Sequence, residues 1–125
     1  YYFVGQNGRR KDFRAVGWLT ENGGWQLLSK HYKGCIGPIG ITLISLSKVV
    51  VTIFFEYIDY LKNRSERSVS SSSKIILNHP SCFEQAIQRA IDFKKVVVYS
   101  NQNLYACQLI KEFKVRLPQV DIITI

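Results

Sequence analysis

Methionine is absent from this chain of 125 residues, and cysteine, histidine and proline are scarce. The three cysteines, Cys35, Cys82 and Cys107, are an odd number without a closely spaced pair, which excludes a disulfide framework and favours a reducing cytoplasm. No methionine stands at position 1, and no signal-peptide pattern follows. We therefore expect a fragment, such as the C-terminal domain of a longer chain, that works in the cytoplasm or is delivered into one as part of a larger protein.

Acidic residues are few, because nine Asp and Glu stand against 17 Lys and Arg, a formal net charge of +8. A small domain with this charge attracts polyanions, which include nucleic acid, anionic lipid and acidic proteins such as a cognate inhibitor. Hydrophobic residues make up 46% of the chain, enough for a core, which excludes a disordered chain. The length fits one domain, and we expect residues 1–125 to form it.

A long uninterrupted apolar run is also missing. The most apolar stretch, residues 41–61, contains Lys48 near its middle and is followed by Glu56 and Asp59 within its last third. Charges at such depths are costly in a bilayer, so we expect no transmembrane segment. The β-branched residues 49–53 instead predict a buried strand, preceded by a short helix or strand over residues 41–46.

Residues 1–33 have the pattern of a β meander. Residues 1–4, 13–20 and 25–32 are strand-like, and Asn-Gly turns at positions 7–8 and 22–23 separate them. The glycines between positions 34 and 40 predict a loop, and the polar, serine-rich residues 62–73 predict a mobile surface loop.

The last third alternates helix and strand. Ser81 and Glu84 match a capping box, and apolar residues at helical spacing follow, at positions 83, 86, 87, 90 and 91. Residues 96–99 predict a buried strand, Asn101 or Asn103 can cap a second helix, and residues 120–125 form the last strand. We expect an α/β (mixed α+β) fold: an N-terminal antiparallel β meander followed by an α-β-α-β tail, with one mixed sheet, helices packed on it and a parallel pairing of the last two strands.

Basic and aromatic residues gather in the N-terminal third and in the polar loop. Cations beside flat rings suit a surface that holds phosphates and stacks bases. We predict nucleic-acid binding, RNA before DNA, by these residues: Arg9, Arg10, Lys11, Arg14, Lys30, Lys33, Trp18, Trp25, Arg64 and Arg67.

The two histidines, His31 and His79, suggest a catalytic version of this function. A metal-independent ribonuclease needs a general base, a general acid and a cation for the phosphate, and Arg14, Lys30 or Lys33 could supply the cation. Such a nuclease would suit a toxin or effector domain. The alternatives are a non-catalytic nucleic-acid or ribonucleoprotein binding module, and a protein-interaction or membrane-surface domain that uses residues 41–55.

Complete cofactor and metal motifs are missing from the sequence. There is no Cys-x-x-Cys pair, no glycine-rich phosphate loop with its Lys-Ser/Thr pair, and no serine nucleophile elbow. We expect no bound metal and no cofactor.

The tail shows one family resemblance. Cys82 and Glu84 open its first helix, and its second helix carries Cys107. The match continues through Leu109, Ile110, Phe113, Lys114 and Pro118. Residues 82–125 thus resemble the closing half of toxin-type deaminases of the cytidine-deaminase-like fold. The resemblance implies Cys82 and Cys107 as zinc ligands and Glu84 as a catalytic proton shuttle. Asn103 and Leu104 stand where that family has a proline and its first paired cysteine, so the zinc motif is degenerate. We therefore expect a related fold with different or no chemistry, not an active zinc deaminase.

Overall fold

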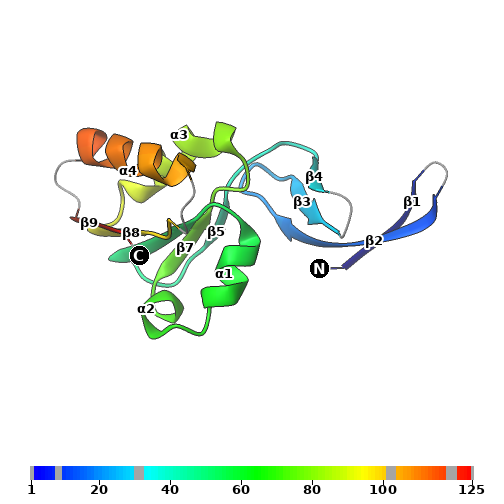
Figure 1. The fold of residues 1–125 in the computed structure, drawn as a ribbon, viewed down its shortest axis with the longest axis horizontal. Coiled ribbons are helices and arrows are strands. Elements are labelled where there is room, and N and C mark those ends of the chain that lie inside the picture. The colour runs from blue at the N-terminus through cyan, green and yellow to red at the C-terminus, as the bar shows by residue number, and fades with distance from the viewer. Residues whose placement is uncertain (1, 8–9, 30–32, 101–103, 118–120, 125) are drawn as a thin grey trace. The chain divides into compact units, whose positions relative to one another are not determined.

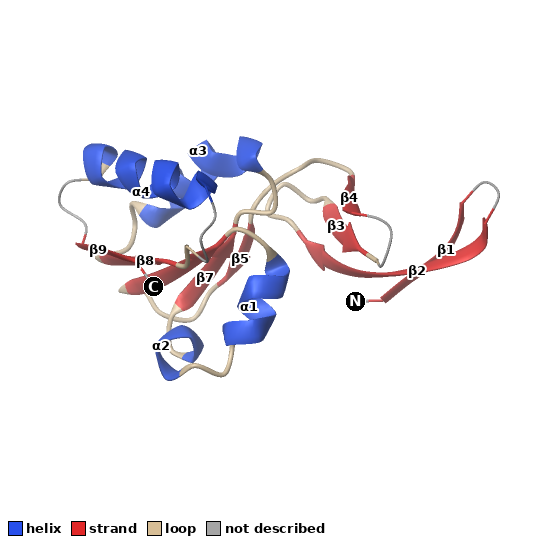
Figure 2. Cartoon of the chain, in the orientation of Figure 1, coloured by secondary structure: helices blue, strands red, loops and turns tan. Residues whose placement is uncertain are grey.

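The computed structural model describes residues 2–7, 10–29, 33–100, 104–117 and 121–124. The chain divides into two compact units, Tyr1–Gly40 and Ile41–Ile125. The mixed α and β content expected from the sequence is confirmed, with strands in both units and helices in the second (Figure 2). The strands form two sheets, however, one antiparallel and one mixed, where we expected a single mixed sheet.

The first unit is an antiparallel meander, as expected. Its strands, in sheet order, are β1 (Tyr2–Asn7), β2 (Arg10–Leu19), β3 (Trp25–Leu28) and β4 (Lys33–Ile36). The third strand is shorter than expected, and the loop predicted from residue 34 is wrong at its start, because β4 pairs there with β3. Gly34, which suggested a loop, lies opposite Leu27 in this pair. The strand is recognised from its pairing with β3 and not from its residue types.

Strand β2 is longer than β1 and β3, and it pairs with β1 through its first part and with β3 through its last part. It pairs with β1 from Arg10 to Val16 and with β3 from Val16 to Leu19. Residues 10–15 and β1 therefore form a two-stranded ribbon that extends beyond β3 (Figure 1). We call this segment the β1–β2 ribbon, and its second strand contains Arg10, Lys11 and Arg14.

The turn between β2 and β3 confirms the Asn-Gly prediction. The Gly24 backbone N–H donates to Thr20 Oγ1 at 3.0 Å, and the Gly23 N–H donates to the Thr20 carbonyl at 3.1 Å. Gly23 has φ of +88°, which favours glycine. The backbone also passes close to Pro38 at Gly24. A Cβ atom at Gly24 would lie 2.1 Å from the carbonyl oxygen of Pro38, so only glycine fits here.

The second unit is built on a five-stranded mixed sheet, counted over the described residues. Its sheet order is β5 (Thr42–Ile44), β7 (Ser73–Ile76), β6 (Val50–Phe54), β8 (Lys95–Val98) and β9 (Asp121–Thr124). Only the β5–β7 pair is antiparallel among these pairings. The structure confirms the buried strand expected near residues 49–53 and the parallel pairing of the last two strands.

Helices cover both faces of this sheet (Figure 1). On one face, α3 (Phe83–Ala90) and α4 (Leu104–Arg116) pack on a core that includes Val51 and Ile53 of β6. The buried residues Ala86, Ile87 and Ala90 confirm the helical apolar pattern. On the other face, Phe54 and Ile76 pack with residues of α1 (Tyr57–Asn63) and α2 (Arg67–Ser70). Because side chains alternate along a strand, β6 supplies both cores.

Two expectations about loops and caps are wrong. Residues 62–73 are not one surface loop, because they include the end of α1, all of α2 and Ser73 of β7, whose side chain is buried. The capping box is also not formed. Ser81 lies inside the short 3₁₀ helix η1 (Pro80–Cys82), α3 begins after Cys82 without a side-chain cap, and Glu84 bonds elsewhere.

Lys74 lies in the middle of β7 and is only 5% exposed. Its Nζ donates to the carbonyl oxygen of Ser70, the last residue of α2, at 3.4 Å. Burial lowers the pKa of this lysine, because the charged ammonium loses water that one long hydrogen bond does not replace.

Within the part of the chain that the structure describes, no helix has the length and apolar character needed to cross a membrane.

Candidate functional site

The carboxyl ends of β6, β7, β8 and β9 lie at one edge of the mixed sheet, because these strands run parallel. The chain leaves β6 into α1 on one face and leaves β8 toward α4 on the other. The connections therefore diverge between these neighbouring strands, and open α/β sheets bind ligands at such a point. This edge is the candidate functional site of the second unit.

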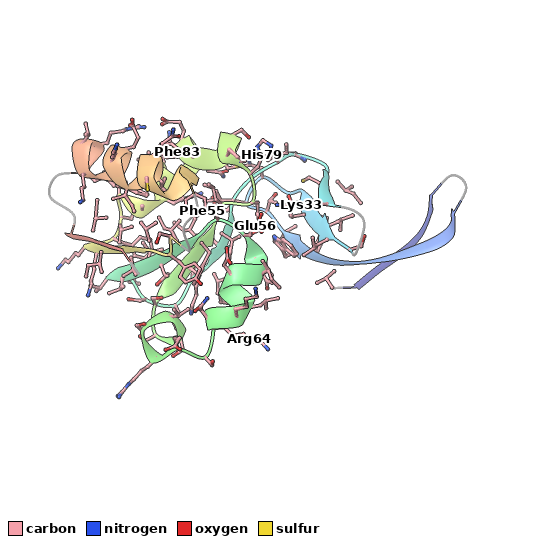
Figure 3. All side chains as sticks on the ribbon, in the orientation of Figure 1. Lys33, Phe55, Glu56, Arg64, His79 and Phe83 are labelled. Atoms are coloured by element: carbon pink, nitrogen blue, oxygen red, sulfur yellow. The ribbon has the colours of Figure 1, made fainter. Side chains whose placement is uncertain are left out.

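Glu56 is an acidic residue at this edge, two positions after Phe54, the last residue of β6. It is exposed and occupies the N-cap position of α1, where its side chain makes no capping hydrogen bond (Figure 3). Sequence reasoning used this residue only to exclude a membrane span. Its position could have identified it, since a charged residue that comes just after a buried parallel strand lies at the ligand-binding edge of the sheet.

A cluster of aromatic rings packs on the face of the sheet that α1 covers. Phe54 contacts Tyr60 and Tyr99 with ring centroids 5.9 and 5.5 Å apart, and Tyr57 contacts Tyr60 at 5.3 Å. Burial and the neighbouring Tyr60 raise the pKa of Tyr57, against a smaller lowering by the Arg64 cation. Tyr57 therefore stays protonated and neutral at physiological pH, and its ring packs against Tyr60 and the core of this face.

A cavity of about 650 Å³ opens at the same edge on the α3–α4 side. Its apolar part comes from the ends of β6 and β7 and the start of α3, and its polar part comes mainly from α4. The lining residues are Phe55, Leu77, Pro80, Phe83, Glu84, Gln108, Lys111 and Glu112. Volumes of roughly 300–1,000 Å³ with mixed linings are typical of small-molecule sites.

Glu84, a predicted catalytic residue, lines this cavity and forms a bidentate salt bridge with Arg116. Arg116 Nη1 donates to Oε1 at 2.5 Å and Nη2 donates to Oε2 at 3.0 Å. These hydrogen bonds lower the pKa of Glu84, so it remains a carboxylate, and they raise the pKa of Arg116. The pair links the first turn of α3 to the last turn of α4 across exposed surface.

His79, the second predicted catalytic histidine, caps the 3₁₀ helix η1. Its Nδ1 accepts the backbone N–H of Ser81 at 3.1 Å and lies 2.7 Å from Ser81 Oγ. A nitrogen that accepts a backbone N–H carries no proton, so the neutral ring is protonated at Nε2. Nε2–H can donate to a ligand, whereas the basic nitrogen is already engaged. The adjacent Asn78 has φ of +67° and donates to Thr42 Oγ1 at 2.8 Å, which holds this corner in place.

No family model, curated protein or solved structure matches this chain.

The other predicted catalytic residue, His31, lies outside the described residues, as do Arg9 and Lys30. His79 and Glu84 belong to the second unit, whereas His31 belongs to the first. The pairing of His31 with His79 therefore stays a prediction.

The predicted nucleic-acid-binding residues are spread over several elements. Arg10, Lys11 and Arg14 belong to the second strand of the β1–β2 ribbon, and Lys33 is exposed at the start of β4. Arg64 and Arg67 are exposed at the end of α1 and the start of α2.

The two tryptophans do not share a surface. Trp18 lies opposite Gln26, whereas Trp25 lies opposite Leu19, the residue next to Trp18. Because neighbouring residues of a strand point to opposite faces, the half-buried Trp18 and Trp25 lie on opposite faces of the sheet. The two rings therefore do not form one stacking surface.

The cysteines that the deaminase resemblance implies as ligands differ in exposure. Cys82 is buried at the start of α3, where it belongs to the core, and Cys107 is exposed on α4. Among the residues with described placement, no three His, Cys, Asp or Glu side chains are grouped so that they could hold a metal ion.

Proposed function

We propose that this chain is a nucleic-acid-binding domain that contacts the phosphate backbone mainly through its first unit. Residues 1–40 contain six basic and two acidic residues, a net charge of +4 over less than a third of the chain. Phosphate contacts by Lys and Arg supply most of the sequence-independent affinity for nucleic acid. The concentration of charge in the first unit is the observation that carries this proposal.

The β1–β2 ribbon gives these charges a defined support. Its second strand contains Arg10, Lys11 and Arg14, and its residues 10–15 have no partner strand other than β1 among the described pairings. A two-stranded ribbon is narrow enough to lie along a nucleic-acid groove or strand, as in other β-ribbon proteins. Lys33 adds an exposed cation on the same sheet.

Charge-matched variants test this proposal. The triple variant Arg9→Gln, Arg10→Gln, Lys11→Gln should weaken binding of a labelled single-stranded RNA in fluorescence anisotropy by roughly tenfold or more. The control triple variant Lys48→Gln, Lys94→Gln, Lys114→Gln removes the same charge from exposed positions of the second unit and should weaken binding much less. Equal weakening by both triple variants would mean that net charge alone attracts the RNA, and the assignment to the first unit would fail.

Binding without cleavage is the version that the site favours. The Nδ1 of His79 already accepts a backbone hydrogen, and Glu84 is bound by Arg116, so neither predicted catalytic group of the second unit is placed to remove a proton from a 2′-hydroxyl. We expect total RNA to remain intact after incubation with the domain in EDTA. Cleavage that is lost in both His31→Ala and His79→Ala would replace binding by the metal-free ribonuclease version.

Other polyanions are the competing partners. Polyglutamate stands for an acidic inhibitor protein, and vesicles with anionic lipid stand for a membrane surface. If either binds as tightly as RNA at equal salt, the function of the basic unit is not specific to nucleic acid.

A further inference from the structure

We propose that the cavity between α3 and α4 binds one nucleobase of a single-stranded nucleic acid, an inference that rests on the proposed nucleic-acid binding. The cavity lies within the second unit, at the carboxyl ends of β6 and β7, and it is lined by described residues. It is separate from the charged ribbon that carries the proposed backbone contacts. The two features would therefore recognise different parts of one ligand.

The apolar part of the cavity suits a flat ring. Phe55 and Leu77 are 7% and 3% exposed and belong to the core, so they form a firm base for a ligand. Phe83 packs against the same core but is only half-buried, and Pro80 is exposed. Figure 3 shows Phe55, the residue after β6, and Phe83, the first residue of α3. Aromatic side chains of this kind stack on bases of any sequence.

The polar part of the cavity matches the edge of a base. Gln108, Lys111 and Glu112 are exposed at spacings of three and four residues, so they lie on one side of α4. The Gln108 amide can both donate and accept, and the Glu112 carboxylate can accept from an amino group. Lys111 can reach a phosphate next to the base.

The charges around the cavity favour a neutral group. Glu84 is bound by Arg116, which also lies near enough to Glu112 to feel its charge. The lining contains two carboxylates, Glu84 and Glu112, and one cation, Lys111. Arg116, which binds Glu84 from outside the lining, offsets the remaining negative charge. A triphosphate would gain little from such a rim, whereas a neutral base with several donors and acceptors can use it. The aromatic side chain of a peptide offers fewer polar groups and would leave the rim without partners.

The test compares two strands of equal length and charge, one with all its bases and one abasic throughout. The probes are labelled oligonucleotides of about 12 residues, within the range of single-strand site sizes. The wild-type domain should bind the strand with bases about tenfold more tightly than the abasic strand. Phe83→Leu keeps an apolar core contact but removes the ring, and it should lower this preference to about twofold.

Two further variants distinguish the cavity from the ribbon. Val115→Ala truncates an apolar side chain of α4 that is 77% exposed and does not line the cavity, and it should keep the full preference. The triple variant Arg9→Gln, Arg10→Gln, Lys11→Gln should weaken binding of both strands by the same factor. A thermal melt of each variant confirms that it is folded.

The outcomes separate failure of the base-binding cavity from failure of nucleic-acid binding. Equal wild-type affinity for the two strands, or an unchanged preference in Phe83→Leu, overturns the base-binding cavity and leaves the nucleic-acid function intact. Displacement of the strand with bases by a tryptophan-containing peptide, with no effect on the abasic strand, assigns the cavity to a protein partner and also overturns the inference. Failure of the folded wild type to bind either strand overturns both proposals.

Discussion

Lys74 is a charged residue at a buried position of β7. It is 5% exposed in β7, and burial lowers its pKa from the usual 10.5. In the unfolded chain this lysine binds its proton up to about pH 10.5, whereas the folded protein releases it at lower pH. Between the two pKa values the unfolded state binds more protons, so the free energy of unfolding rises with pH in that window.

The substitution Lys74→Met tests this assignment. Methionine has a similar length and no charge, so the variant should be at least as stable as the wild type at pH 7. The advantage should shrink as pH rises toward 10.5, because the wild type then loses the cost of its buried charge. Urea unfolding at several pH values measures the difference, and Lys114→Met, at an exposed position, is the control. A difference that grows with pH would contradict the assignment.

Single residues of the site were predictable only where their neighbours in sequence decide their role. The turn at Gly23 was predicted from the Asn-Gly pair, because glycine readily adopts a positive φ. Glu84 was assigned to a capping box, but it bonds to Arg116, which lies 32 positions later in the chain. No local pattern could show that contact, because the packing of α3 beside α4 creates it.

At the scale of elements, His79 caps the short helix η1 that precedes α3. His79 Nδ1 accepts the Ser81 N–H, and without it this donor at the start of η1 would have no side-chain acceptor. His79→Ala should therefore lower the free energy of unfolding by about 1 kcal/mol, the usual cost of losing a helix cap. His79→Asn keeps an acceptor at the cap position and should recover most of the loss, which chemical denaturation of the three proteins would show. Equal stability of His79→Ala and wild type would mean that the cap contributes nothing.

The elements found from sequence are those with a clear apolar pattern. The strands β6 and β8 are short β-branched runs, and α3 shows buried residues at helical spacing. The missed helix α1 has no fully buried residue, so it lacks the periodic signal. The missed strand β7 is buried along its whole length, but its first two residues, Ser73 and Lys74, are polar and concealed it.

The cavity could not be predicted from the pattern of any single helix or strand. Its lining comes from the ends of two strands, from the start of α3 and from the middle of α4. These segments are up to 57 positions apart, from Phe55 to Glu112, and only the strand order β7-β6-β8 brings them to one edge. Once parallel strands and their order are known, the position of the site follows.

At the scale of the whole molecule, both units are basic. Residues 1–40 and residues 41–125 each have a net charge of +4, so the first unit is about twice as densely charged as the second. The composition alone predicted an attraction to polyanions. The structure adds that three of the charges lie on one strand of the β1–β2 ribbon and that the second unit has a cavity with polar residues in its lining.

The salt dependence of RNA binding tests this account most directly. Anisotropy titrations of a labelled single-stranded RNA, from about 50 mM to about 200 mM salt, give the slope of log affinity against log salt concentration. Each phosphate contact on a single strand contributes about −0.7 to that slope, so we predict about −2 or steeper for the wild type. For the triple variant Arg9→Gln, Arg10→Gln, Lys11→Gln, this slope should be less negative, by about 0.7 for each phosphate contact that is lost. A slope near zero, or no saturable binding by the folded wild type at about 50 mM salt, would contradict nucleic-acid binding as the function of this chain.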